Sequence, residues 1–246
     1  IKIDPVTNTL IRDGVPSIIN PDDKNALEEA LRIKDENPDT TVTVVSMGPP
    51  QADVAMREAL AMGADEAILI SGREFGGSDT WATSYIIATA IKKIPDYDII
   101  FCGRQAIDGD TAQVGPQIAE QLNIPQITYV QKLDIEGDKV IVQRQLEDGY
   151  TVVEAKMPVL LTAIKELNTP RYMTPKGIFE AYNKTVQVWG FNDVPVDAEK
   201  IGLKGSPTNV NRTFSPEAKG KGIMLEGADK ETVKTLIAKL DEKHLL

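Results

Sequence analysis

Metal-binding and nucleophilic side chains are scarce in this sequence of 246 residues, which contains one cysteine, Cys102, and one histidine, His244. A single cysteine excludes an intrachain disulfide and a zinc site built from several cysteines. His244 lies in the last turn of the chain, so a Ser-His-Asp arrangement has no histidine where a site would form. We therefore predict no catalytic side chain and no metal ligand set.

Excess positive charge and long apolar runs are also missing. The 37 acidic residues outnumber the 27 basic ones, for a net charge of −10, which argues against a protein that binds nucleic-acid phosphates. No apolar run reaches the roughly 18 residues that cross a bilayer, and no signal peptide is visible. We expect a cytoplasmic protein that binds no nucleic acid and has no membrane span.

The sequence does contain a regular alternation of short apolar runs and helical patterns. Runs at 41–47, 67–70 and 99–102 are separated by amphipathic stretches of about a dozen residues. Such spacing indicates βαβ crossovers and a parallel sheet covered on both faces. We predict an α/β fold with a doubly wound, mostly parallel, Rossmann-like sheet of the adenine-nucleotide-binding kind. An added hairpin is expected over 130–146, with its turn at Gly137 and Asp138.

The two ends of the chain depart from this alternation. Residues 1–19 predict a β-ribbon with a turn at 5–8, and the stretch from 193 to 222 shows little periodicity. A helical pattern over 230–243 then carries its apolar residues on one face. We therefore divide the chain into an α/β nucleotide-binding domain, 1–192, and an extended arm with a C-terminal helix, 193–246, that packs on a partner subunit.

The stretch from Tyr97 to Leu122 is the most informative one. An apolar run ends at Gly103, a polar loop follows, and Thr111 opens an amphipathic pattern, which together predict strand, loop and helix. Ligands of open parallel sheets bind where strands end and helices begin, because a helix N-terminus offers unpaired N–H groups to an anion. We therefore predict a nucleotide phosphate at this turn.

Within this loop, Thr111, Gln113 and the backbone of Gly109 and Gly115 are suitable phosphate donors, and Arg104 brings positive charge. The acids beside them need another explanation. Asp108 and Asp110 would repel a phosphate at close range, so they cap the helix, face solvent or accept hydrogen bonds from ribose hydroxyls. Ordinary turn and cap chemistry is the alternative interpretation of the whole loop.

Two other polar stretches precede predicted helices. Residues 20–23, Asn-Pro-Asp-Asp, match a helix start with Asn20 as N-cap and acids at the positive end of the dipole. Residues 76–80, Gly-Gly-Ser-Asp-Thr, resemble the pyrophosphate loop of ATP pyrophosphatases, and a nucleotide-sensing module on a similar sheet is a further alternative. A cap by Ser78 or Asp79 explains the second stretch without a ligand.

Seven stretches together resemble the β subunit of electron transfer flavoproteins and follow the family's order along the chain. They are INPDDKNALEEAL (19–31), VTVVSMGPPQA (42–52), ALAMGADEAILI (59–70), SDTWATS (78–84), CGRQAIDGDTAQVGPQIAEQL (102–122), LNTPRYMTP (167–175) and GLKGSPT (202–208). Family members usually begin with a strand that this chain lacks, and we expect that the chain is truncated there.

The resemblance implies a doubly wound domain that holds an adenine nucleotide and pairs with an α subunit carrying a redox-active FAD. The nucleotide contacts that it implies are Asn20, Asp22, Asp23, Met47, Gly48, Arg104, Gln105, Asp108, Gly109, Asp110, Thr111, Gln113, Val114 and Gly115. The stretch LNTPRY resembles the family's recognition loop for acyl-CoA dehydrogenases, with Leu167 as the apolar anchor beside Arg171 and Tyr172. A core leucine at the end of a strand is the alternative for Leu167.

The resemblance leaves two functions open. In the conventional type the β subunit holds a structural AMP. In the electron-bifurcating type it holds a second FAD, which takes a hydride from NADH and passes one electron to ferredoxin or flavodoxin and the other, through the α subunit, to an acyl-CoA dehydrogenase. Asp22 stands where conventional members carry a bulky aromatic residue, and Gly109 and Ala112 are small, so the resemblance favours the bifurcating type.

Overall fold

The alternation of strands and helices predicted from the sequence is confirmed by the computed structural model, which describes residues 2–3, 10–11, 17–211 and 220–246. The helices of the described part are α1 (Pro21–Glu36), α2 (Asp53–Met62), α3 (Thr80–Ile91), α4 (Val114–Leu122), α5 (Pro175–Asn183), α6 (Gly202–Gly205) and α7 (Lys230–Glu242). Of these described helices, none combines the length and the apolar character needed to cross a membrane.

The strands are β1 (Lys2–Ile3), β2 (Leu10–Ile11), β3 (Thr43–Met47), β4 (Glu66–Ile70), β5 (Ile99–Gly103), β6 (Gln126–Glu136), β7 (Lys139–Leu146), β8 (Gly149–Lys156), β9 (Val159–Ala163) and β10 (Val186–Trp189). The pair β1–β2 is antiparallel, as the predicted N-terminal ribbon requires, and the turn expected at 5–8 lies outside the described residues.

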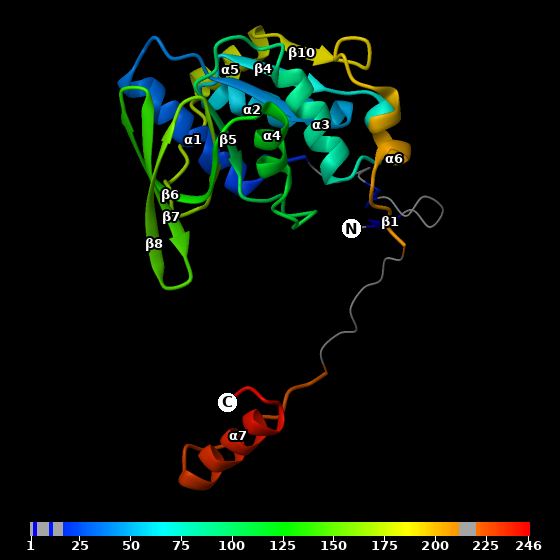
Figure 1. The fold of residues 1–246 in the computed structure, drawn as a ribbon. Helices are drawn as coiled ribbons and strands as arrows, with labels where there is room; N and C mark the ends of the chain where they lie inside the picture. The colour runs from blue at the N-terminus through cyan, green and yellow to red at the C-terminus, as the bar shows by residue number, and fades with distance from the viewer. Residues whose placement is uncertain (1, 4–9, 12–16, 212–219) are drawn as a thin grey trace. The chain divides into compact units, whose positions relative to one another are not determined.

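The two larger sheets are wholly or partly parallel. One has the order β10-β4-β3 and is parallel throughout, whereas the other has the order β5-β9-β6-β7-β8, with parallel pairing from β5 to β6 and antiparallel pairing beyond. The antiparallel part is the predicted hairpin with a third strand added, and it extends away from the parallel strands (green in Figure 1). Because Met47 pairs with Ile70 and Gly103 with Ala163, neighbouring parallel strands end at the same level.

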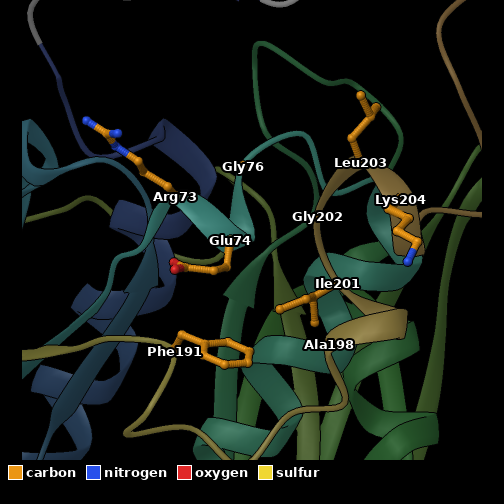
Figure 2. Close-up of a pocket in the computed structure, with 9 residues that line it drawn as sticks. All are labelled: Arg73, Glu74, Gly76, Phe191, Ala198, Ile201, Gly202, Leu203 and Lys204. Carbon is orange, nitrogen blue, oxygen red and sulfur yellow. The ribbon is translucent and has the colours of Figure 1, made fainter.

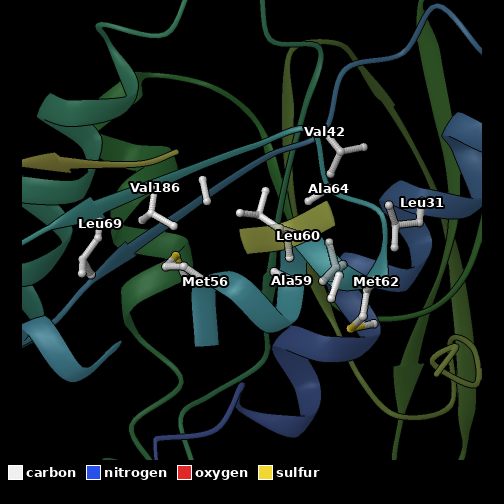
Figure 3. Close-up of a cluster of buried hydrophobic side chains, with 13 residues drawn as sticks. Leu31, Val42, Met56, Ala59, Leu60, Met62, Ala64, Leu69 and Val186 are labelled. Atoms are coloured by element: carbon white, nitrogen blue, oxygen red, sulfur yellow. The ribbon is translucent and has the colours of Figure 1, made fainter. Parts of the chain in front are cut away.

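The core lies where α1 and α2 pack against the first sheet. Leu31, Leu60 and Leu69 are buried there with smaller residues between them (Figure 3). Burial of a leucine side chain contributes about 2 kcal/mol each, so this cluster is a main source of stability. A second cluster gathers around Val130 and Leu161 of the second sheet and includes Ala26 of α1. Helix α1 therefore packs against both sheets.

The chain divides into two compact units between Val210 and Asn211, later than the boundary after residue 192 that composition suggested. The reason is burial, because Val194 and Ile201 are almost fully enclosed in the first unit. In the second unit, Asp229 caps α7 by accepting a hydrogen bond from the N–H of Thr232 at 2.8 Å. The apolar residues of α7, such as Leu236, are about half exposed.

Candidate functional site

The start of α1 holds the loop that follows β5. The N–H of Gly103 donates to Oδ1 of Asp23 at 2.6 Å. Nδ2 of Asn20 donates to the carbonyl oxygen of Gln105 at 2.8 Å, and Oδ1 of Asn20 accepts from the N–H of Ile107 at 3.0 Å. The sequence placed Asn20 as a helix cap, but its side chain makes no capping bond. Asn20 and Asp23 therefore position the loop of residues 104–113, to which they are distant in sequence.

Gly103 is required at this junction because the two segments touch. A Cβ atom added at Gly103 would lie 2.6 Å from the backbone nitrogen of Asp23 and 2.8 Å from the carbonyl carbon of Asp22. Both neighbours are backbone atoms of α1, which cannot rotate away as a side chain would. The apolar run of β5 therefore ends in a glycine for a steric reason that the local pattern does not reveal.

The stability of the protein is expected to depend on pH through the carboxyl group of Asp23. Its burial raises its pKa above the ordinary value of an aspartate, despite the hydrogen bonds from Gly103 and Asn20. The native state then holds the proton more tightly than the unfolded chain, so the stabilising contribution is complete below about pH 4 and is lost as the pH rises through the native pKa.

We therefore expect the Asp23→Asn variant, which carries no charge at this position, to gain stability relative to the wild-type chain as the pH rises from about 4 to about 7. Urea denaturation of both proteins across that range measures the difference. A difference in unfolding free energy that does not change with pH would contradict the burial of this charge.

The 104–113 loop differs from the sequence prediction at its end. Helix α4 begins at Val114 rather than at Thr111, because Asp110 and Ala112 adopt left-handed backbone angles, with φ of 52° and 53°, that a helix cannot contain. The N-cap residue of α4, Gln113, makes no side-chain capping bond. Its Oε1 instead accepts from Oγ1 of Thr80, the first residue of α3, at 3.1 Å. The starts of α3 and α4 are thus adjacent.

Most of the predicted nucleotide contacts in this loop are exposed. Asp108, Gly109, Asp110, Thr111 and Gln113 are exposed. Gln105 donates from its side chain to the carboxylate of Asp110, so that acid stabilises the loop's own shape.

Gly115, by contrast, has a packing role. A Cβ atom at this position would lie 2.7 Å from Sγ of Cys102, so the glycine lets α4 pack closely on β5. Burial raises the pKa of the Cys102 thiol far above its ordinary value, and the nearby Asp23 carboxyl adds to the rise. The thiol is therefore a core group and not a nucleophile.

Arg104 is the one cation of the predicted loop, and its surroundings fit an anionic group. Its Nε atom is buried without a hydrogen-bond partner among the described residues, although it lies 3.4 Å from Oδ2 of Asp22. The guanidinium also lies over the ring of Tyr129, 5.8 Å from the ring centre. A buried donor without a hydrogen bond, beside the first turn of α1, is suited to a phosphate that shares the guanidinium with Asp22.

Tyr129 and Thr162 lie near Arg104 in the structure, and the sequence did not single them out. Tyr129 has a left-handed φ of 58° at an irregularity in the pairing of β6 with β9, and its N–H donates to Oγ1 of Thr162 at 3.1 Å. Non-glycine residues in this conformation are uncommon and occur often at functional sites. No local sequence signal marks either residue, because the irregularity depends on pairing with a distant strand.

The remaining predicted nucleotide contacts lie at the end of β3. The N–H of Gly48 donates to the carbonyl oxygen of Ile70 at 3.0 Å, and Met47 packs against the cluster that contains Ile70 and Phe75. Helix α3 packs against both β3 and α4. The structure thus connects this strand end to the 104–113 loop through α3.

The glycine-rich loop at 76–80 has structural partners that account for its residues. Asp79 caps α3 by accepting from the N–H of Ala82 at 3.0 Å, and its second oxygen accepts from the N–H and Oγ1 of Thr208. Burial alone would raise the pKa of Asp79, but these hydrogen bonds hold it below its ordinary value. Oγ of Ser78 accepts from the N–H of Gly202 at 2.9 Å. The cap interpretation therefore explains this loop without a pyrophosphate.

A cavity of about 340 Å³ lies beside this loop and apart from the predicted nucleotide contacts. Arg73, Glu74 and Phe191 form one side of it, and Leu203 and Lys204 of α6 form the other (Figure 2). None of the predicted cofactor contacts lines this cavity. We therefore do not assign the nucleotide to this cavity.

The 167–172 loop lies against α1 through polar contacts. Arg171 forms a two-pronged ion pair with the carboxylate of Glu28, at 2.9 and 3.1 Å. Leu167, predicted as an apolar anchor for a partner, is only 8% exposed and packs in the cluster around Val130. Tyr172 is 94% exposed. In this conformation Tyr172, not Leu167, is accessible to another protein.

Comparison with known proteins agrees with this arrangement. Residues 7–194 match the electron transfer flavoprotein domain. The whole chain is 62% identical to an electron transfer flavoprotein subunit beta of Thermoanaerobacterium thermosaccharolyticum, of which it covers 94%. It is also 57% identical to the caffeyl-CoA reductase-Etf complex subunit CarD of Acetobacterium woodii, again over 100% of the chain and 94% of the relative.

A third relative is the acryloyl-CoA reductase electron transfer subunit gamma of Anaerotignum propionicum, which is 54% identical over 97% of the chain and 91% of the relative. The match to the domain covers well over half of the chain, and its range includes both the 104–113 and the 167–172 loops. The chain belongs to the β subunits of the electron transfer flavoprotein family.

Proposed function

We propose that this chain holds the second FAD of an electron-bifurcating flavoprotein, with the diphosphate of the cofactor at the start of α4. The observation that carries the proposal is the Nε atom of Arg104, a buried donor without a hydrogen-bond partner among the described residues. The 104–113 loop around it is held by Asn20 and Asp23 of α1. Backbone N–H groups at the uncapped start of α4 supply further donors for an anion.

The proposal places the other parts of the cofactor on the contacts expected from the sequence. Thr111 and Gln113, exposed beside the start of α4, donate to phosphate oxygens. The adenine lies toward Met47 and Gly48, and Asp108 or Asp110 accepts from ribose hydroxyls. When bound, the flavin supplies the redox chemistry, while the residues of this chain bind it, orient it and set the charge around it.

The small side chain of Asp22 supports FAD over AMP in this subunit. An aspartate leaves room beyond the diphosphate that a bulky aromatic residue would fill, and Oδ2 of Asp22 lies 3.4 Å from Nε of Arg104. In the proposed assembly, NADH donates a hydride, and the electrons go to ferredoxin or flavodoxin and to an acyl-CoA dehydrogenase. Two relatives carry names of acyl-CoA reductase complexes, which agrees with such a partner.

The partner subunit in this proposal is the α subunit of the flavoprotein. The apolar face of α7, which includes Val233, Leu236 and Ile237, is about half exposed in the second unit. An amphipathic helix of this kind is stable when that face is covered. We propose that the α subunit covers it, and that Arg171 and Tyr172 belong to the surface that meets the dehydrogenase.

Replacement of Arg104 tests the position of the diphosphate. The Arg104→Gln variant removes the charge, and we expect its dissociation constant for FAD or AMP to rise at least about tenfold, since a charge-assisted hydrogen bond to phosphate is lost. Arg73→Gln is the matched control, because Arg73 lines the separate cavity beside α6. Titration of each variant with both nucleotides measures the effect. Equal affinities in the two variants would overturn this placement of the phosphates.

A further inference from the structure

Helix α1 makes side-chain contacts with two loops that are far apart in the sequence. At its N-terminal end, Asn20 and Asp23 hold the 104–113 loop and its junction with β5 through hydrogen bonds to Gly103, Gln105 and Ile107. Each of these contacts joins a polar side chain of α1 to a backbone group, so the loop follows the position of the helix.

About two turns further along, the same helix holds the 167–172 loop. Nδ2 of Asn25 donates to the carbonyl oxygen of Asn168 at 2.8 Å, and Nδ2 of Asn168 returns a bond to the carbonyl oxygen of Asn25 at 3.0 Å. Nδ2 of Asn168 also donates to Oε2 of Glu29 at 2.8 Å. The N–H of Arg171 donates to Oε2 of Glu28 at 3.0 Å, in addition to the ion pair of its side chain.

The contacts with the second loop are unusual because the polar residues of α1 that make them are buried. Asn25, Glu28 and Glu29 are each 5–6% exposed. A buried polar group that loses its partner costs about 1–3 kcal/mol, and more if it is charged, so the loop and these side chains separate only at a high cost.

Helix α1 itself has little freedom to absorb a displacement. Leu27 and Leu31 lie in the core cluster of the first sheet, and Ala26 lies in that of the second. Asn20 and Glu28 are separated by about 12 Å along the helix, at 1.5 Å for each residue. A shift at one end of this packed helix is therefore transmitted to the other.

We propose that α1 couples the two loops. Asn25 and Glu28 act as positioning residues, so that the conformation of the 167–172 loop depends on whether the 104–113 loop is ordered. The role of this coupling in electron transfer rests on the function proposed above. With a nucleotide bound, the coupled loop would present Arg171 and Tyr172 to the dehydrogenase in a fixed arrangement. The coupling itself is a property of this chain alone. By linkage it acts equally in both directions.

Hydrogen exchange of individual amides in the full chain tests the coupling. In the Asn20→Ala variant, which loses its bonds to the first loop and one bond to Asp23 but none to the 167–172 loop, we expect the amide of Arg171 to exchange at least about fivefold faster. In the Glu28→Gln variant we expect the same change at the amide of Gly103, at the opposite end. Lys24→Ala is the matched control, because Lys24 lies on the same helix but pairs with Glu58 of α2.

A reference amide distinguishes this coupling from a general loosening of the protein. Ala90 of α3 is fully buried in an apolar cluster that contains no residue of α1, so its exchange stays unchanged in all variants if the effect is specific. Asn20→Ser, which keeps a short polar side chain but loses the amide donor to Gln105, is measured alongside in case Asn20→Ala does not fold. We expect an intermediate acceleration at Arg171 in that variant.

An Arg171 amide that exchanges equally in the Asn20 variants and in Lys24→Ala would overturn the coupling. So would acceleration that appears to the same degree at Ala90. Neither measurement requires a cofactor or a dehydrogenase. A protein that shows the coupling but binds no flavin would therefore contradict the proposed function alone, and a flavin-binding protein without the coupling would contradict only this inference.

Discussion

The Leu167→Ala variant is expected to lose about 2–4 kcal/mol of unfolding free energy. Leu167 is 8% exposed and packs with Val130 and Ala163 beneath the 167–172 loop, so its truncation removes buried apolar surface and leaves a cavity. Urea denaturation measures the loss. The family resemblance suggested another role, an apolar anchor in contact with a dehydrogenase, and a side chain of that kind would contribute little to the stability of the free subunit.

The matched control is Tyr172→Ala in the same loop. Tyr172 is 94% exposed, so its removal is expected to change stability by less than about 0.5 kcal/mol. If Tyr172 contacts the dehydrogenase, its removal raises the KM for that partner while nucleotide content stays the same. A Leu167→Ala protein of unchanged stability that transfers electrons poorly would instead support the anchor role and require the loop to open on binding.

The Gly103→Ala variant is expected to lose about 2–3 kcal/mol, because its added methyl group meets backbone atoms of α1. The nearest are the nitrogen of Asp23 at 2.6 Å and the carbonyl carbon of Asp22 at 2.8 Å. Relief of the clash requires α1 to move away from β5, which costs packing in addition to the hydrogen bond between Gly103 and Asp23. The loss is measured as a lower midpoint of urea denaturation.

Gly109→Ala provides the comparison for the effect of the methyl group itself. A Cβ atom at Gly109 has no neighbour within 4 Å. This variant should match or slightly exceed the stability of the wild-type chain, since alanine restricts the unfolded state. Equal losses in both variants would show that loss of glycine flexibility, and not the contact with α1, is responsible.

The sequence predicted the parts of the fold that depend on local patterns. The apolar runs that became β3, β4 and β5 and the helix that ends at Gly63 are close to their predicted bounds, because periodicity and a glycine C-cap are local signals. Strand β10 was not predicted. Its four residues, Val186–Trp189, make too short a run to be recognised alone, and they become a strand by pairing with β4.

The candidate site shows the same division. Residues 104–113 were predicted as its main loop. The start of the following helix was predicted at Thr111, but α4 begins at Val114. The difference comes from left-handed backbone angles at Asp110 and Ala112, which have no reliable sequence signal in residues other than glycine. Asn20 matched the pattern of a helix cap. Its actual partners, Gln105 and Ile107, lie more than 80 positions away.

The role of α1 could not be predicted for the same reason. Glu28 and Asn25 look like ordinary polar positions of an amphipathic helix, and such positions are usually exposed. Their burial follows from the 167–172 loop, which approaches from about 140 residues away in sequence and supplies Arg171 and Asn168 as partners. Long-range polar partners of this kind become visible only in the folded chain.

The nucleotide content of the complex between this chain and its α subunit tests the central claim most directly. The nucleotides are released by denaturation, separated by chromatography and counted for each pair of subunits. We predict two FAD per pair, together with reduction of ferredoxin that depends on NADH and on the acyl-CoA dehydrogenase. One FAD and one AMP per pair would contradict the proposal and make this chain the structural half of a conventional electron carrier.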